Sequence, residues 1–366
     1  MSEGPPPVPN PSTKEKFLEY YRRNEVMVQS IVFVGGFLFD LLTLGRIDDL
    51  FNLLQQAFYL TILGTLLILE IKKKTGTLIL SKRGEKFWDY HELLVHFLFG
   101  SLLSVYVIFY FSSASAITGT LFILLLAGFM FANEFPQIQR LGLPVRVILF
   151  SICLLSYFSF VYPILLGHVG VIPFWLGFLS SGITFGLIYR ANFKVDTTLL
   201  LKHVLAPAVG VHLFFLFGYY FSLIPPVPVA VKKIGVYYND VVRENGKYHG
   251  RYTREWYKFW QKGSQDFEAR PGDKITVLLS IFSPGSFEDK VYLKWYHEGD
   301  LQDSIPLSIL GGRDEGFRGF GTKSFYKPGS WKVIVETSDG REVGRISFDI
   351  ENDISTEVRE FKWDVF

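Results

Sequence analysis

Cysteine is almost absent from this sequence, and charge is scarce in its first 224 residues. The one cysteine, Cys153, lies in an apolar run, where packing in a core is its expected role. A single cysteine excludes an internal disulfide framework and a CxxC metal site. No other motif for a metal or cofactor is found, and we expect neither. The first 224 residues hold 16 basic and 13 acidic side chains, and the remainder holds 21 and 22. Neither part is basic enough to predict nucleic-acid binding.

Apolar residues are abundant instead. Hydrophobic residues make up 49% of the chain and aromatic residues 17%, and the mean hydropathy is +0.25, which favours a membrane protein. Crossing the hydrocarbon core takes about 20 mostly apolar residues. Seven segments qualify: 27–44, 51–71, 92–112, 115–132, 145–166, 171–190 and 203–223. We therefore predict an α-helical polytopic membrane domain of about seven transmembrane helices over residues 27–223, which places the chain in a lipid bilayer.

Basic residues predict how these spans are oriented. The N-terminal tail (1–26) and the second, fourth and sixth loops together hold 15 Lys and Arg, whereas the other loops hold only Arg46. Basic loops stay in the cytoplasm, so we expect a cytoplasmic tail and a C-terminal region across the membrane. The tail lacks the apolar core of a cleavable signal peptide. The seventh span is the weakest, because it begins with Lys202 and His203 and contains Pro207; if it does not cross, the C-terminal region is cytoplasmic.

A proline-rich connector at 224–230 separates the spans from a region with another pattern. From residue 275 to 281 apolar and polar side chains largely alternate, and similar runs follow. Turn signals separate these runs, among them Asp339-Gly340, which predicts a hairpin. Strands at this spacing predict a mostly antiparallel β-sandwich over residues 231–366.

The glycine-rich stretch GGRDEGFRGFGTKSF, residues 311–325, raises the question of a phosphate-binding loop. It matches neither GxGxxG nor GxxxxGK[ST], and it does not open a helix, so no helix N-terminus is available for phosphate. We interpret it as tight turns leading into a strand, with glycines at positive φ. Its basic residues Arg313, Arg318 and Lys323 are nevertheless candidates for binding an anion or an envelope partner.

Polar side chains in or near the spans are the candidates for function inside the membrane. These are Asp40, Arg46, Asp48, Glu92, His96 and His212. Asp40 can pair with Arg46 to stabilise the first helical hairpin, or it can serve a proton or ion relay. The HELLVH stretch at 91–96 is not a zinc motif, because its histidines are five residues apart instead of four. Glu92 and His96 are four apart and are expected to pair at the cytoplasmic end of the third span.

An aromatic cluster follows the connector. Its members are Trp256, Tyr257, Phe259 and Trp260. The spacing of Trp256 and Trp260 places both on one face of a helical turn. The cluster can pack on the sandwich, lie at the lipid interface or stack on sugars. Ser324 to Lys327 formally matches S-x-x-K, but it lies in a β region and lacks the partner motifs, so we find no catalytic constellation and expect no enzyme.

Several motifs resemble a known family. They are SIFSPGSFEDKVYLKWYHEG (280–299), GGRDEGFRGFGTKS (311–324) and PGSWKVIVETSDGREVGRISFDI (328–350), with FDLLTLGRIDDLFNLLQQ (39–56) and IPPVP (224–228) in the membrane half. The C-terminal region resembles domain of unknown function 2914 of bacterial membrane proteins. The resemblance implies a polytopic inner-membrane part that carries a periplasmic β domain. The family has no assigned activity, so the resemblance implies no catalytic residues.

These observations lead to one expected function and two alternatives. We expect a membrane-tethered, noncatalytic binding or scaffold module of the bacterial inner membrane that engages an envelope protein or glycan. A transport or ion-coupled component that uses Asp40 is the first alternative. An intramembrane enzyme acting on envelope lipids is the second.

Overall fold

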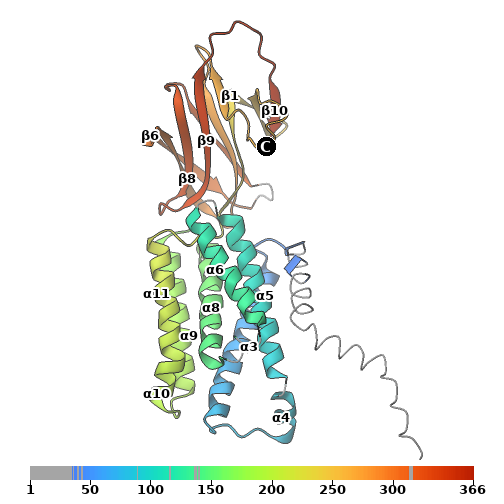
Figure 1. Ribbon diagram of the computed structural model, residues 1–366, viewed down its shortest axis with the longest axis vertical. Helices are drawn as coiled ribbons and strands as arrows, with labels where there is room; N and C mark the ends of the chain where they lie inside the picture. The colour runs from blue at the N-terminus through green and yellow to red at the C-terminus, as the bar shows by residue number, and fades with distance from the viewer. Residues whose placement is uncertain are drawn as a thin grey trace, which may run out of the picture.

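A helical bundle carries a β domain at one of its ends (Figure 1). The computed structural model describes residues 44–88, 90–114, 117–135, 141–312 and 316–366, together with Gly35, Phe37, Leu38, Leu41, Leu42 and Ile138. The predicted tail and almost all of the first predicted span therefore lie outside the described residues, as do Asp40 and Arg313.

Five helices in the described part of the chain are long and apolar enough to cross a membrane. They are α3 (Leu50–Lys74), α5 (His91–Ser113), α8 (Leu143–Leu166), α9 (Val171–Ala191) and the continuous segment Thr197–Tyr220. The last comprises α10 (Thr197–Leu200), a π-helical turn (Leu201–Leu205) and α11 (Ala206–Tyr220). A shorter apolar helix, α6 (Ile117–Glu134), and the seven-residue α4 (Lys82–Trp88) complete the bundle. The prediction of an apolar helical region is confirmed.

Pro207 does not interrupt the last helix. It lies inside the continuous segment Thr197–Tyr220, directly after the π-helical turn, where the Ala206 amide donates to the Leu201 carbonyl five residues earlier.

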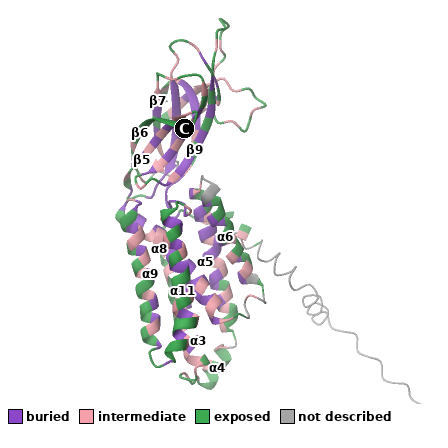
Figure 2. Ribbon diagram, turned by 60° about the vertical axis from the view of Figure 1, so that its left-hand side comes forward, coloured by how far each residue is buried: buried purple, intermediate pink, exposed green. Residues whose placement is uncertain are grey.

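The helices are apolar on all sides, as expected for segments that face both a packed interior and lipid. Phe99, Leu103 and Tyr106 of α5 are fully buried, whereas large apolar side chains such as Phe58 and Phe97 are exposed. Exposed residues lie on the outside of the bundle and buried ones within it (Figure 2). Small residues let neighbouring helices approach closely: a Cβ at Gly177 of α9 would lie 3.1 Å from that of Phe158 in α8.

The β domain consists of two five-stranded sheets. One has the order β10-β2-β1-β4-β7 and the other β3-β9-β8-β5-β6. The strands are β1 (Ala230–Glu244), β2 (Lys247–Tyr252), β3 (Asp266–Ala269), β4 (Ile275–Phe282), β5 (Glu288–His297), β6 (Asp300–Leu310), β7 (Phe317–Lys323), β8 (Gly329–Thr337), β9 (Glu342–Asn352) and β10 (Lys362–Val365). Pairing is antiparallel except between β3 and β9. The sheets share one core, to which Val277 contributes from one side and Trp295 and Val333 from the other.

The sequence-based expectation is wrong for residues 255–261. The spacing of the two tryptophans predicts a helical turn, but the segment forms turns in the loop between β2 and β3. Two backbone hydrogen bonds form in this loop, from the Lys258 amide to the Glu255 carbonyl and from the Gln261 amide to the Lys258 carbonyl. Each spans three residues, as in a β-turn, instead of the four of an α-helix.

Candidate ligand pocket at the junction of the two domains

The turn between α8 and α9 carries the first group of contacts between bundle and β domain. The Glu288 amide donates to the Gly167 carbonyl at 2.9 Å, and the Ser286 hydroxyl donates to the Ile164 carbonyl at 2.6 Å. The Val169 amide donates to a carboxylate oxygen of Asp289 at 3.2 Å. One bond joins backbone to backbone and the other two join a β-domain side chain to backbone of the bundle, so the β domain is held against the bundle end in a fixed register.

Only glycine fits at position 167. Its φ is +75°, which L-residues adopt at a cost, and an added Cβ would lie 2.5 Å from the carbonyl oxygen of Ser286. The same residue ends helix α8, so one glycine serves as helix cap and contact point.

Asp48 forms the second contact group. It lies in the loop before α3, accepts from the Gly285 amide at 3.0 Å and pairs with Arg46 at 2.8 Å. Burial raises the pKa of Asp48, but the hydrogen bonds from Arg46 and Gly285 lower it by more, so the pKa lies below its ordinary value. Arg46 and Asp48, candidates for a role inside the membrane, thus lie at the junction, and the expected partner Asp40 is outside the described residues.

The hairpin turn between β8 and β9 makes the third contact group. The Tyr219 hydroxyl at the end of α11 donates to Asp339 at 3.0 Å, and Arg341 donates to the same carboxylate oxygen at 2.8 Å. The Arg341 guanidinium also lies 4.9 Å from the centre of the Tyr219 ring. The predicted Asp339-Gly340 turn is therefore present, and it faces the bundle.

The glycine-rich stretch supports the loop that docks on the bundle, residues 283–287. The Gly311 amide donates to the Phe287 carbonyl at 2.9 Å, and a Cβ at Gly311 would lie 1.5 Å from the Pro284 carbonyl oxygen. Gly312 and Gly316 have φ values of +88° and +84°. The interpretation as tight turns with positive-φ glycines is confirmed.

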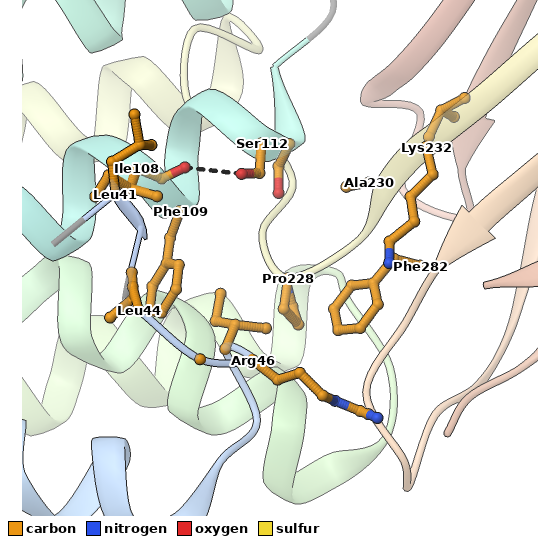
Figure 3. Close-up of a pocket in the computed structure, with 14 residues that line it drawn as sticks. Leu41, Leu44, Arg46, Ile108, Phe109, Ser112, Pro228, Ala230, Lys232 and Phe282 are labelled. Carbon is orange, nitrogen blue, oxygen red and sulfur yellow. Dashed lines mark hydrogen bonds between the residues drawn. The ribbon is translucent and has the colours of Figure 1, made fainter. Parts of the chain in front are cut away.

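A pocket of about 660 Å³ lies between the bundle and the β domain (Figure 3). Ile108, Phe109 and Ser112 from the last turns of α5 form one wall. The other wall is formed by Pro228, Ala230, Lys232 and Phe282 from the β domain and its connector, and Leu44 and Arg46 complete the pocket from the loop.

Two cations flank one aromatic ring in this pocket. The Lys232 ammonium lies 5.1 Å and the Arg46 guanidinium 5.6 Å from the centre of the Phe282 ring. The Ser112 hydroxyl donates to the Ile108 carbonyl at 2.9 Å. Carboxylates and imidazoles are absent from the described lining residues. An apolar wall with cations at one end suits an amphiphile with an anionic head group.

The opposite end of the bundle holds an ion-pair network around the buried Glu70 and Arg146. Arg146 of α8 contacts Glu70 of α3 at 2.7 Å and Glu92 of α5 at 2.9 Å, and Lys74 contacts Glu70 at 2.7 Å. The expected Glu92–His96 pair is therefore wrong: the buried Arg146 takes Glu92 as a counter-charge. This network was not predicted from the sequence, although Glu70 lies four residues before Lys74 at a helix end, a spacing that indicates an ion pair.

The two remaining intramembrane histidines are held by local contacts. His96 Nδ1 lies 3.3 Å from the Asn133 side-chain oxygen of α6. His212 of α11 is buried, with Nδ1 2.8 Å from the Ala208 carbonyl oxygen, and its ring packs edge-on against Phe178 and Phe185. Within the described residues no group of three or more His, Cys, Asp or Glu side chains is arranged to hold a metal ion.

The two described basic residues of the glycine-rich stretch, Arg318 and Lys323, do not form one site, and the third, Arg313, lies outside the described residues. Arg318 and Lys323 are five apart on β7, so they lie on opposite faces of the sheet. Lys323 pairs with Asp303 at 2.5 Å, whereas Arg318 lines a hollow on the outer face together with Lys232. The structure thus separates two residues that the sequence places close together.

The aromatic cluster of the β2–β3 loop does not pack on the sandwich. Trp256 and Phe259 are 83% and 78% exposed, and Tyr257 and Trp260 are exposed as well. The rings contact one another edge to face in pairs, Trp256 with Tyr257 and Phe259 with Trp260. Packing on the sandwich, one of the three expectations for this cluster, is therefore wrong.

Comparison with known proteins bears on the β domain. No curated protein matches the chain significantly. A crystal structure of an immunoglobulin-like protein from Pseudomonas aeruginosa matches 34% of this chain and 98% of its own, at 14% identity and a TM-score of 0.22, too low to carry an argument. Residues 288–350, which span β5 to β9, match the family described as "Protein of unknown function (DUF2914)". The C-terminal part of this chain therefore contains a DUF2914 domain, as its motifs predicted.

Proposed function

We propose that this protein is a noncatalytic binding module tethered to the bacterial inner membrane by seven spans, with its β domain in the periplasm. The distribution of charge on the bundle supports this orientation. Basic residues gather at the end opposite the β domain: Lys72, Lys73, Lys74, Lys82, Arg83, Lys86, Arg146, Arg190, Lys194 and Lys202. At the end that faces the β domain, the only Lys or Arg in the described helical region is Arg46. A basic end is typical of the cytoplasmic side.

The topology is tested by fusing alkaline phosphatase or a fluorescent protein after Phe366. Phosphatase activity without fluorescence supports the proposal, because the enzyme folds only in the periplasm. Fluorescence without phosphatase activity contradicts it.

The ligand in this proposal is an anionic amphiphile held in the junction pocket. The observation that carries it is the composition of the pocket: both domains supply walls, the lining is mainly apolar, and its two charged lining residues are the basic Lys232 and Arg46, of which Arg46 is also paired with Asp48. The pocket adjoins the last turn of α5, where a span ends and lipid head groups begin. An amphiphile can therefore place its chain beside the helix and its head group beside the cations.

Filling the pocket tests this function. Ser112→Phe places a ring in the pocket, whereas Thr61→Phe is the matched control on an exposed face of α3. Both hydroxyls donate to the carbonyl four residues earlier, at 2.9 and 2.8 Å, so both changes remove the same bond. Native mass spectrometry of the full chain with phosphatidylglycerol should show strong loss of bound lipid for Ser112→Phe and none for Thr61→Phe. Equal retention by both variants contradicts the proposal.

A transport or ion-coupled function is the second candidate. The buried Glu70–Arg146 pair favours it, because ionisable groups inside a bundle are costly and often functional. In proteoliposomes, Glu70→Gln should abolish an ion flux if this candidate is correct. A chain that carries no flux at all excludes it.

A further inference from the structure

Helix α5 has one side that is not fully buried along most of its length. The half-buried or exposed residues on this side recur every three or four positions, and most of the residues between them are buried. They are Leu94, Phe97, Ser101, Val105, Ile108 and Ser112. We call these six residues the α5 stripe.

Pockets lie at both ends of the α5 stripe. Ile108 and Ser112 line the junction pocket, whereas Leu94 and Phe97 line a second pocket of about 760 Å³ towards the opposite end of the bundle. Leu66 of α3 lines the second pocket as well, so this end of the stripe borders α3. The described lining residues of the second pocket include no Lys, Arg, Asp or Glu, which suits an apolar occupant.

The first predicted span, residues 27–44, reaches the junction end of the α5 stripe. Leu41 and Ile108 line the same pocket (Figure 3). Phe37, one helical turn before Leu41, is partly buried against the core of the bundle, whereas Leu42 is 85% exposed. The helical residues of this segment therefore turn one side towards the bundle and the other side outwards.

Helical periodicity extends the inward side away from the junction. Residues before Gly35 lie outside the described part of the chain, so their place follows from the sequence spacing. Ser30 precedes Leu41 by 11 residues, and Phe97 precedes Ile108 by the same number. Eleven residues make about three helical turns and about 16 Å. Because both segments run towards the junction, a helix that starts beside Ile108 and follows α5 brings Ser30 beside Phe97.

The connection to α3 restricts where this segment lies. Only residues 45–49 separate the segment from α3, whose N-cap is Asp49. A connection of this length favours antiparallel neighbours. A helix that neighbours α3 and meets α5 at Ile108 lies over the α5 stripe, because the stripe borders α3 at the second pocket.

We propose that residues 27–44 form a helix that docks along the α5 stripe, from the second pocket to the junction pocket. The side that holds Phe37 and Leu41 covers the stripe, and the small Ser101 near its middle lets the two helices approach closely. Docking also holds Leu41 as a wall of the junction pocket. This inference rests on the proposed function in one respect, because it takes residues 27–44 as one of the seven spans.

Disulfide formation between engineered cysteines of the full chain in membranes tests this arrangement. Cys153 is first replaced by alanine, and Ser30→Cys is then combined with Phe97→Cys at an exposed position of the stripe. A disulfide needs Cα atoms within roughly 7 Å of each other. Copper phenanthroline is the oxidant, and peptide mapping by mass spectrometry identifies the bond. Equal melting temperatures of the reduced variants establish that folding is retained.

Two control pairs test the oxidation and the side of the helix. Leu41→Cys/Ile108→Cys joins two residues of one pocket and shows that the oxidant reaches the bundle. Val28→Cys/Phe97→Cys places the first cysteine two residues from Ser30, on the opposite side of the predicted helix.

A third control pair tests which side of α5 is covered. Ser30→Cys/Phe131→Cys has its second cysteine at an exposed position of α6. The depth matches that of Phe97, because His96 Nδ1 lies 3.3 Å from the Asn133 side-chain oxygen.

Ser30→Cys/Phe97→Cys should form a disulfide within one chain under conditions that oxidise Leu41→Cys/Ile108→Cys. The pairs Val28→Cys/Phe97→Cys and Ser30→Cys/Phe131→Cys should stay reduced. This result would place the inward side of the first span on the α5 stripe.

Three results would overturn the inference. A disulfide to position 131 in place of position 97 puts the segment on the other side of α5. A disulfide between two chains, seen as a dimer on a nonreducing gel, shows that a second copy covers the stripe. No disulfide at position 97, while Leu41→Cys/Ile108→Cys is oxidised, shows that the segment leaves the bundle. The phosphatase fusion tests the topology separately, so failure of the docking and failure of the proposed function are distinguishable.

Discussion

Gly167→Ala is predicted to loosen the docking of the β domain without unfolding either part. Two costs are expected. The positive φ costs an alanine about 1–2 kcal/mol, and the new Cβ would lie 2.5 Å from the Ser286 carbonyl oxygen. The contact cannot relax within the helix cap, so the docking loop must move away. Movement breaks the bond from the Glu288 amide to the Gly167 carbonyl, now 2.9 Å long.

Gly76→Ala is the control that separates these costs. Gly76 follows helix α3 with a φ of +68°, and no atom lies within 4 Å of its added Cβ, so the alanine there meets only the backbone cost. Both variants should lower the melting temperature, Gly167→Ala by more because it also bears the contact cost. Only Gly167→Ala should speed hydrogen exchange of the Glu288 amide, by about tenfold for each 1.4 kcal/mol of lost docking free energy. Equal exchange at Glu288 in both variants would refute the reasoning.

Three further changes test other parts of the structure. The hydrogen bond from the Gly285 amide to the Asp48 carboxylate should weaken as the pH falls. Because the pKa of Asp48 is lowered in the folded chain, the stabilisation that the ionised Asp48 gives is complete above about pH 4. It is lost as the pH falls through the pKa of Asp48 in the folded chain. Asp48→Asn should remove this pH dependence from the protection of the Gly285 amide, that is, its exchange rate relative to the intrinsic rate at each pH, and a persisting dependence of the protection would contradict it. Gly311→Ala should lower the stability of the β domain by more than about 2 kcal/mol, measured by denaturant unfolding, and an unchanged midpoint would contradict the tight packing. Arg146→Leu should destabilise the bundle by up to about 3–5 kcal/mol, because it removes the buried partner of Glu70 and leaves only the more exposed Lys74 beside it, and adding Glu70→Gln should recover part of the lost thermal stability; no recovery would argue against the pair.

Hydropathy predicted the helical region well, because long apolar runs have few alternatives to a helix in lipid. Pro207 made the seventh span the weakest prediction, but the helix continues through it, with a π-helical turn directly before the proline. Strands with regular alternation, such as 291–296 and 331–335, were equally visible. Strand β1 was not predicted, because the bulge at Lys232 and a second irregularity between Tyr238 and Val242 interrupt its period.

The junction could not be predicted, because it joins residues that are far apart in the sequence. Asp48 and the Gly285 amide are separated by 237 positions, and no local pattern records their contact. The sequence did point to Arg46 and Arg318, which line the two concavities, but it grouped Arg318 with Lys323. Strand geometry separates those two side chains, and strand geometry also brings Lys232 and Lys247 beside Arg318.

Photo-crosslinking at Phe282 tests the central claim, that the junction pocket holds an amphiphile, most directly. Benzoylphenylalanine replaces Phe282, which lines the pocket from the β domain, and in a control it replaces Phe325, which is 90% exposed. Cells are irradiated, and the adducts on the purified full chain are identified by mass spectrometry. A lipid adduct at position 282 and none at position 325 is the predicted result. Position 282 without a lipid adduct, or equal lipid adducts at both positions, would contradict the account.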